Sequence, residues 1–203
     1  MTTVFYLVRH ALKEKAIGDV SISSEGLRQA YATASHFRDL PISRIFSSPL
    51  NRARQTADII GRGANRWIST DARLRERANW GDLPEQTFEE FVEMWDRCTN
   101  ERDFSPPVGD SARGAGERLS SCLTEWTARY PEEQLIIVTH GGLITDFLVN
   151  EFSPEELNQK HPNFINEQSH LVSECSITVI SRSADGFRLI DFANTAHLTS
   201  RFT

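Results

Sequence analysis

Two short apolar segments of the sequence each end in a histidine. Val4–Val8 is followed by Arg9 and His10. Leu135–Thr139 is followed by His140. Short runs of strand-forming apolar residues are typical of strands buried on both faces of a parallel sheet. Because open α/β sheets bind ligands at the carboxyl ends of their strands, we expect the two histidines to meet at one edge of the sheet.

The neighbours of these histidines favour an anionic ligand. Arg9 carries a planar fork of donors that suits phosphate or carboxylate. Gly141-Gly142 allows backbone N–H groups at a helix N-terminus to approach an anion closely. Arg52 and Arg54 lie in the first turns of an expected helix after Ser48-Pro49. The alternative to a ligand-binding role is an exposed surface position for each arginine. This alternative has more weight for Arg54 than for Arg52.

Strand and helix patterns alternate along the chain, which indicates the α/β class. Strands are expected at 4–8, 44–47, 135–139, 177–180 and 187–192, with the last two forming a hairpin. Helical spacing of apolar residues appears at 27–37, 53–60, 88–95, 119–130 and 143–148, and a short helix follows Ser153-Pro154. Ser24 and Ser48 are the expected N-caps of the first two helices. We expect a single domain over 1–203, with the irregular segment 64–85 and a possible inserted lid at 78–116.

Composition excludes several classes of protein. The chain has 203 residues, of which 39% are hydrophobic and 25% charged, which is ordinary for a globular protein. Its formal net charge of −6 argues against a nucleic-acid binder. No segment predicts a membrane span or a secretory leader. The three cysteines form no CxxC pair, so they predict small buried side chains in a cytoplasmic protein.

Other common catalytic patterns are absent from the sequence. It contains no GxxxxGK[ST] phosphate loop, no HExxH and no GxSxG. His161 and His170 lack a paired carboxylate, so we interpret them as surface or pocket-rim residues rather than metal ligands.

Several segments, in order, resemble motifs of the histidine phosphatase superfamily, the phosphoglycerate-mutase-like group. Leu7-Val8-Arg9-His10 resembles its RHG signature, and the segment 22–30 is similar to its LTxxGxxQA. The segment 47–57, SSPLNRARQTA, resembles SSPLxRAxQTA, and Leu74-Arg75-Glu76 with Gly81 resembles LRExxxG. Val138–Gly142 matches the second histidine block, and 194–198 resembles the closing segment.

The resemblance implies a fold, a chemistry and roles for particular residues. The family fold is a mixed, mostly parallel sheet flanked by helices, and no metal or other cofactor is used. His10 matches the nucleophile, Arg9 and Arg52 match the phosphate-clamping arginines, and His140 matches the second phosphate-binding histidine, followed by Gly141. Glu76 matches the proton donor, with Asp82 as the alternative.

Three positions depart from the family pattern. Ala11 replaces the glycine after the nucleophile, at a cost of roughly 1 kcal/mol if that position needs a positive φ. Leu12 stands where Glu or Gln is frequent, and Glu174 stands where asparagine is frequent. The stretch 11–16 also lacks the asparagine of the mutase branch, leaving Lys13 and Lys15 as its cations.

These observations predict a metal-independent phosphomonoester hydrolase that acts through a phosphohistidine on His10. A phosphoglycerate-type phosphomutase is the alternative within the family. A catalytically silent phospholigand-binding protein is the alternative from another class. The substrate is left open between small phosphorylated molecules and phosphoproteins, and so is the oligomeric state. The candidate pocket residues outside the motifs are Trp80, Trp95, Arg102, Arg113, His161 and His170.

Overall fold

The computed structural model describes residues 2–199 and forms an α/β fold. Six strands occur in these residues: β1 (Thr3–Arg9), β2 (Arg44–Ser47), β3 (Ile68–Thr70), β4 (Gln134–Thr139), β5 (Ile177–Ser183) and β6 (Gly186–Asn194). The helices are α1 (Ser24–Phe37), α2 (Asn51–Ala64), α3 (Phe88–Asn100), α4 (Ala112–Arg129), α5 (Gly141–Glu151), α6 (Pro154–Lys160), α7 (Phe164–Leu171) and α8 (Ala196–Thr199), with a 3₁₀ turn at Ala72–Leu74.

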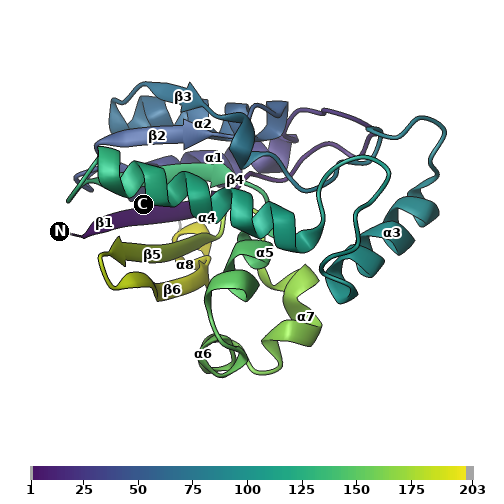
Figure 1. Ribbon diagram of the computed structural model, residues 1–203. Helices are drawn as coiled ribbons and strands as arrows, with labels where there is room; N and C mark the ends of the chain where they lie inside the picture. Colours follow the sequence, from purple (N-terminus) through teal and green to yellow (C-terminus); the bar gives the residue numbers. More distant parts are fainter. Residues whose placement is uncertain (1, 200–203) are drawn as a thin grey trace.

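The strands form one mixed sheet in the order β3-β2-β4-β1-β5-β6. Strands β1 to β4 are parallel, and β5 and β6 are antiparallel to their neighbours. In Figure 1 the carboxyl ends of β1, β2 and β4 point toward the side on which α3 lies. The predicted fold class, a mixed and mostly parallel sheet flanked by helices, is therefore confirmed.

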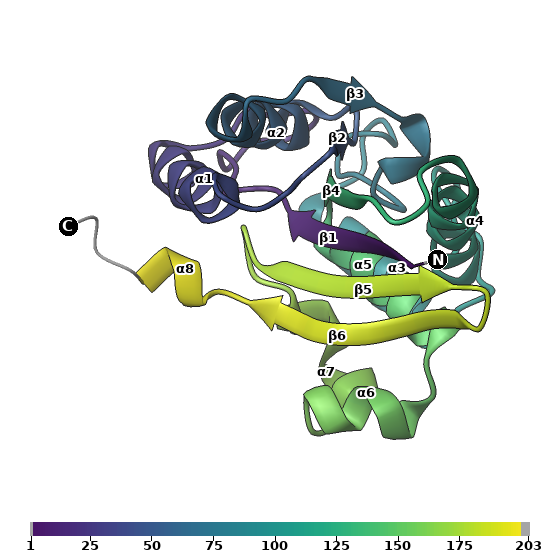
Figure 2. The ribbon, with the colours of Figure 1, turned by 90° about the vertical axis from the view of Figure 1, so that its left-hand side faces the viewer.

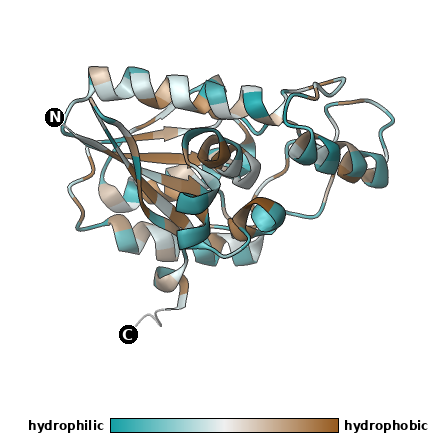
Figure 3. Cartoon of the chain, turned by 60° about the horizontal axis from the view of Figure 1, so that its bottom comes forward, coloured by the Kyte–Doolittle hydropathy of each residue, from teal (hydrophilic) through white to brown (hydrophobic). Residues whose placement is uncertain are grey.

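Alternation along the central strands builds a separate core on each face of the sheet. Phe5 and Leu7 of β1 belong to the core beneath α4 and α5, whereas Val8 belongs to the core beneath α1 and α2. Figure 2 shows these helix pairs on opposite faces, and in Figure 3 hydrophobic residues concentrate on the strands between them. Burial on both faces explains why β1 and β4 lack polar alternation in the sequence.

Two predicted helix starts differ from the structure. The N-cap of α1 is Ser23 rather than Ser24, and its hydroxyl accepts from the Gly26 N–H. Helix α2 begins at Asn51 rather than after Ser48, and the Asn51 N–H donates to the carboxylate of Asp19. A carboxylate from a distant loop therefore replaces the local serine cap.

Three of the strands and α-helices were not predicted. Strand β3 lies within the segment expected to be irregular, and α7 and α8 have no counterpart among the predicted helices. The expected hairpin near the C-terminus is present as β5 and β6. No described helix is long and apolar enough to cross a membrane.

Candidate active site

The register of β1 and β4 brings the two predicted histidines together. Arg9 pairs with Thr139 across these parallel strands, so the next residues, His10 and His140, leave the sheet side by side. The His10 N–H donates to the Thr139 carbonyl at 2.8 Å, and the two imidazole centroids are 5.1 Å apart. Convergence of the two strand ends, expected from the sequence, is present in the structure.

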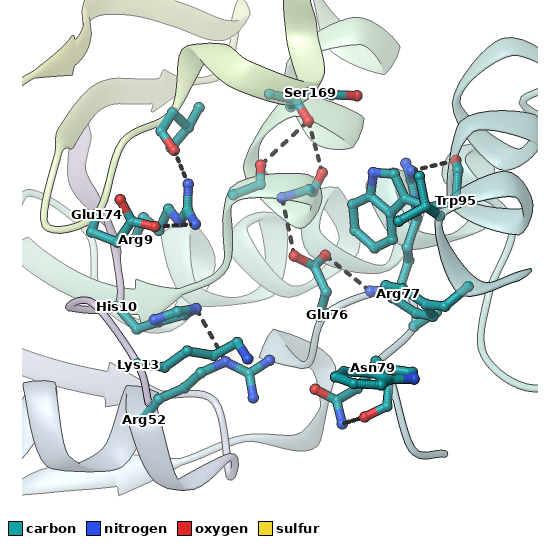
Figure 4. A pocket seen from close by; sticks show the side chains of 18 of the residues that line it. Arg9, His10, Lys13, Arg52, Glu76, Arg77, Asn79, Trp95, Ser169 and Glu174 are labelled. Carbon is teal, nitrogen blue, oxygen red and sulfur yellow. Dashed lines mark hydrogen bonds and ion pairs between the residues drawn. The ribbon is translucent and has the colours of Figure 1, made fainter. Parts of the chain in front are cut away.

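Hydrogen bonds fix the tautomer of His10. Its Nδ1 lies 2.8 Å from the Ala11 carbonyl oxygen, which only accepts, so Nδ1 carries the proton. The guanidinium Nε of Arg52 donates to His10 Nε2 at 3.1 Å. Nε2 therefore holds the lone pair of the ring, and this lone pair accepts the Arg52 hydrogen bond drawn in Figure 4. Ala11 itself has no positive φ, so alanine at this position carries no left-handed strain.

His140 takes the opposite tautomer. Its Nδ1 accepts from Nη2 of Arg52 at 3.3 Å, and its Nε2 donates to the Ser48 hydroxyl at 2.8 Å. Ser48, expected to cap a helix, instead orients this imidazole. His140 is 1% exposed and is not among the residues that line the cavity described below, so its ring lies behind Arg52.

Both imidazoles are held in the neutral form. Burial lowers the pKa of His10 well below its usual range, and the nearby charges of Arg52 and Arg9 lower it further. Burial likewise lowers the pKa of His140 well below its usual range, with His10 and Arg52 adding to the effect. Neutral His10 is the form that can act as a nucleophile.

Two arginines flank His10. Arg52 is 4% exposed, and its Nη1 is buried without a hydrogen-bond partner among residues 2–199. Arg9 donates to the Val172 carbonyl and pairs with the carboxylate of Glu174. The site thus contains one arginine with a donor unused by the described residues and one arginine paired with a carboxylate.

The structure separates the two candidate proton donors. Glu76 lines the same cavity as His10 and accepts from the backbone N–H groups of Gly142 and Arg77, each at 3.0 Å. Asp82 is exposed, pairs with Arg75 and is not among the lining residues. A Cβ on Gly142 would stand 2.8 Å from Glu76 Oε1, so glycine is needed for this close approach.

A cavity of about 510 Å³ opens above His10. Arg9, Arg52, Glu76 and Gly141 line its polar end. Its far wall is mainly apolar and comes largely from α3 and the loop before it, through Trp80, Phe88, Phe91, Val92 and Trp95. Trp95 is fixed by Arg77, whose guanidinium lies 3.7 Å from the ring centroid.

The remaining candidates divide into two groups. Trp80, Trp95 and His170 line the cavity. Arg102, Arg113 and His161 do not, because they bond elsewhere: to Asn150, to Asp103 and to the Pro162 carbonyl. Arg54 is exposed and also lies outside the lining residues.

Sequence reasoning missed two contributions to the site. Ser48 was expected to be a helix cap. Its hydroxyl directly follows the end of a strand, which is a position typical of ligand-site residues in such sheets. Gln168 of α7 is 4% exposed, lines the cavity and has an unpartnered Oε1. No pattern in the sequence predicted α7, so nothing indicated this side chain.

Comparisons with known proteins agree with the geometry. The sequence model of the histidine phosphatase superfamily (branch 1) matches residues 5–195. The uncharacterized phosphatase PhoE of Bacillus subtilis is 28% identical over 204 residues, covering 97% of each chain. The probable phosphoglycerate mutase GpmB of Escherichia fergusonii is 30% identical over 148 residues, covering 67% of this chain and 68% of its own.

A solved structure shares the fold. A variant of phosphoserine phosphatase from Entamoeba histolytica, in complex with phosphoserine, superposes with a TM-score of 0.74 at 21% identity. The match covers 97% of this chain and 99% of that one. Because the family match spans nearly the whole sequence, the chain belongs to the histidine phosphatase superfamily (branch 1).

Proposed function

We propose that this protein is a phosphomonoester hydrolase that works through a phosphohistidine on His10. The observation that carries the proposal is the state of His10: a buried, neutral imidazole that lines the cavity and whose Nε2 lone pair is held by the N–H of Arg52, which a phosphoryl group would displace. A positioned imidazole of this kind splits one difficult displacement into two easier steps.

In the first step, the Nε2 lone pair attacks phosphorus and the bond to the leaving oxygen breaks. Protonated Glu76 gives its proton to that oxygen, and the product alcohol leaves. In the second step, water attacks phosphorus and gives a proton to the Glu76 carboxylate. The N–P bond then breaks, its electron pair returns to Nε2, and phosphate is released.

Arg9 and Arg52 would stabilise the phosphoryl group, because its transfer depends mainly on positioning and charge neutralisation, and His140 would act on it by holding Arg52 in place. Gly141 would contribute by its position at the N-terminus of α5, where backbone N–H groups favour anions. We also propose that segment 78–116 acts as a lid, since α3 supplies much of the apolar wall above the site. A cavity of about 510 Å³ suits a small phosphorylated molecule better than the surface of a phosphoprotein.

A hydrolase is favoured over a mutase by the residues next to the nucleophile. Leu12 is 36% exposed and lines the cavity where a mutase would bind the second acidic group of its substrate. The test offers 3-phosphoglycerate with catalytic 2,3-bisphosphoglycerate, and separately a panel of phosphomonoesters. Phosphate release with negligible isomerisation supports the hydrolase, isomerisation far exceeding phosphate release contradicts it, and no turnover at all favours a silent binding protein.

A further inference from the structure

We propose that Lys13 is a third phosphate-binding cation of this site, which completes the clamp formed by Arg9 and Arg52. The proposal rests on the proposed function, because it assigns a residue to the same phosphoryl-transfer site.

Lys13 is placed at the reacting end of the cavity. It is half-buried and lines the cavity together with His10 and Arg52. In Figure 4 its side chain is drawn between these two residues, and the charge of Arg52 is near enough to lower the pKa of Lys13. The charge of Lys13 is close enough to contribute to lowering the pKa of His10.

The backbone holds Lys13 in this position. Lys13 forms an antiparallel bridge with Ile22, and the next residue, Glu14, donates to the Ser21 carbonyl at 2.9 Å. On the other side, the Leu12 N–H donates to the side chain of Gln29. Lys15 lies beyond this bridge in a bend and is exposed, so it lacks the same support.

No carboxylate among residues 2–199 pairs with the ammonium of Lys13. It takes part in no ion pair there, although the structure contains many between other residues. Burial, Arg52 and Arg9, in that order, lower the pKa of Lys13. An ammonium held beside two guanidinium groups is disfavoured until an anion arrives, which is the expected condition of a ligand-binding cation.

The charges of the groups around His10 indicate what Lys13 would contribute to phosphate binding. Arg9 is paired with Glu174, and both histidines are neutral, which leaves Arg52 as the cation of the clamp that forms no ion pair among residues 2–199. Lys13 adds a second such cation. In the step that starts with protonated Glu76, two unpaired cations suit the two negative charges of a phosphomonoester dianion better than one does.

The test compares Lys13→Met with Lys13→Arg and with Lys160→Met, the loss of an exposed lysine outside the cavity. Calorimetry measures the binding of inorganic phosphate and orthovanadate, and steady-state kinetics measures kcat/KM. Because a hydrogen bond to a charged group is lost, Lys13→Met should weaken anion binding and lower kcat/KM by roughly 10- to 100-fold. Lys13→Arg should retain most of both, and Lys160→Met should change either by less than about threefold.

The outcomes distinguish this proposal from the function on which it rests. If the unmodified protein forms no phosphoenzyme and releases no phosphate, the proposed function fails. If it does both and Lys13→Met binds phosphate as tightly as the unmodified protein, the assignment of Lys13 is wrong. A loss in Lys13→Met that Lys13→Arg does not restore also contradicts it, and Lys13→Gln with circular dichroism separates a lost charge from a lost fold.

Discussion

At the scale of single residues, Arg52 contacts both histidines of the site. Its Nε donates to His10 and its Nη2 to His140, which leaves Nη1 for a ligand. One guanidinium therefore bridges the two histidines, and in the proposed mechanism it also orients the nucleophile and offers a charge to the phosphoryl group. Such a planar, multidentate group has no equivalent in lysine.

Arg52→Ala should lower kcat by at least about 10²-fold, because the charge developing on the phosphoryl oxygens loses a fixed donor. Arg54→Ala is the matched control two residues along the same helix. Its side chain is exposed, so activity should change by less than about threefold. Steady-state kinetics of both variants decides the matter, and an essential Arg54 with a dispensable Arg52 would refute the assignment.

Glu76→Gln should slow hydrolysis of alkyl phosphates far more than that of p-nitrophenyl phosphate. An alkoxide needs a proton as it leaves, whereas nitrophenolate needs little help, and general acid catalysis is worth about 10²- to 10⁴-fold. The measurement is kcat/KM on both substrates. Asp82→Asn is the control, and a leaving-group-dependent loss in that variant, with none in Glu76→Gln, would transfer the role to Asp82.

At the scale of elements, the N-terminus of α5 contacts both Arg9 of the proposed clamp and Glu76, the proposed proton donor. Gly141 allows Arg9 to lie close, since a Cβ there would stand 3.3 Å from Arg9 Cδ. Gly142 donates its N–H to Glu76 and faces Trp95 of α3. The start of this helix thus positions groups from three other parts of the chain.

Gly142→Ala should reduce kcat/KM while leaving the protein folded. Its Cβ would meet Trp95 Cη2 at 2.5 Å and Glu76 Oε1 at 2.8 Å, so one of them must shift. A misplaced acid of this kind costs up to about 10²-fold in rate. Gly114→Ala in α4 is the control, because its only close neighbour is the Ser111 hydroxyl at 3.2 Å. Equal activity of the two variants would show that the close approach at Gly142 is unimportant.

The elements also show what sequence could and could not predict. The strands ending at His10 and His140 were predictable because burial on both faces gives uninterrupted apolar runs. Strand β3 was not, because only the first of its three residues is partly buried and apolar, and the other two are exposed and polar. The start of α2 was misplaced because Asp19, distant in sequence, caps it. The direction of Lys13 depends on its bridge to Ile22, which no local pattern indicates.

At the scale of the whole molecule, buried histidines make the free energy of unfolding depend on pH. His10 and His140 are buried with lowered pKa values, and burial with His36 lowers the pKa of His197 to about 4. In the unfolded chain each histidine binds a proton near pH 6.5. The unfolded state therefore binds more protons in mild acid, and acid destabilises the folded state.

The free energy of unfolding should accordingly fall as pH decreases from 6.5 to 5. Each buried neutral histidine contributes a slope of up to about 1.4 kcal/mol per pH unit. The double variant His10→Asn, His140→Gln should show a shallower slope, because two titrating groups are removed. Urea unfolding at several pH values measures both proteins. Parallel slopes would mean that these imidazoles are not held neutral in the fold.

The central claim is that His10 carries the phosphoryl group, and rapid acid-free quenching with a radiolabelled phosphomonoester tests it most directly. We predict a labelled protein that is stable in alkali and labile in acid, because protonation of the imidazole weakens the N–P bond. Peptide mapping should place the label on His10, and His10→Ala should abolish both label and turnover without unfolding the protein. Normal turnover by His10→Ala, or a label on another residue, would contradict the mechanism.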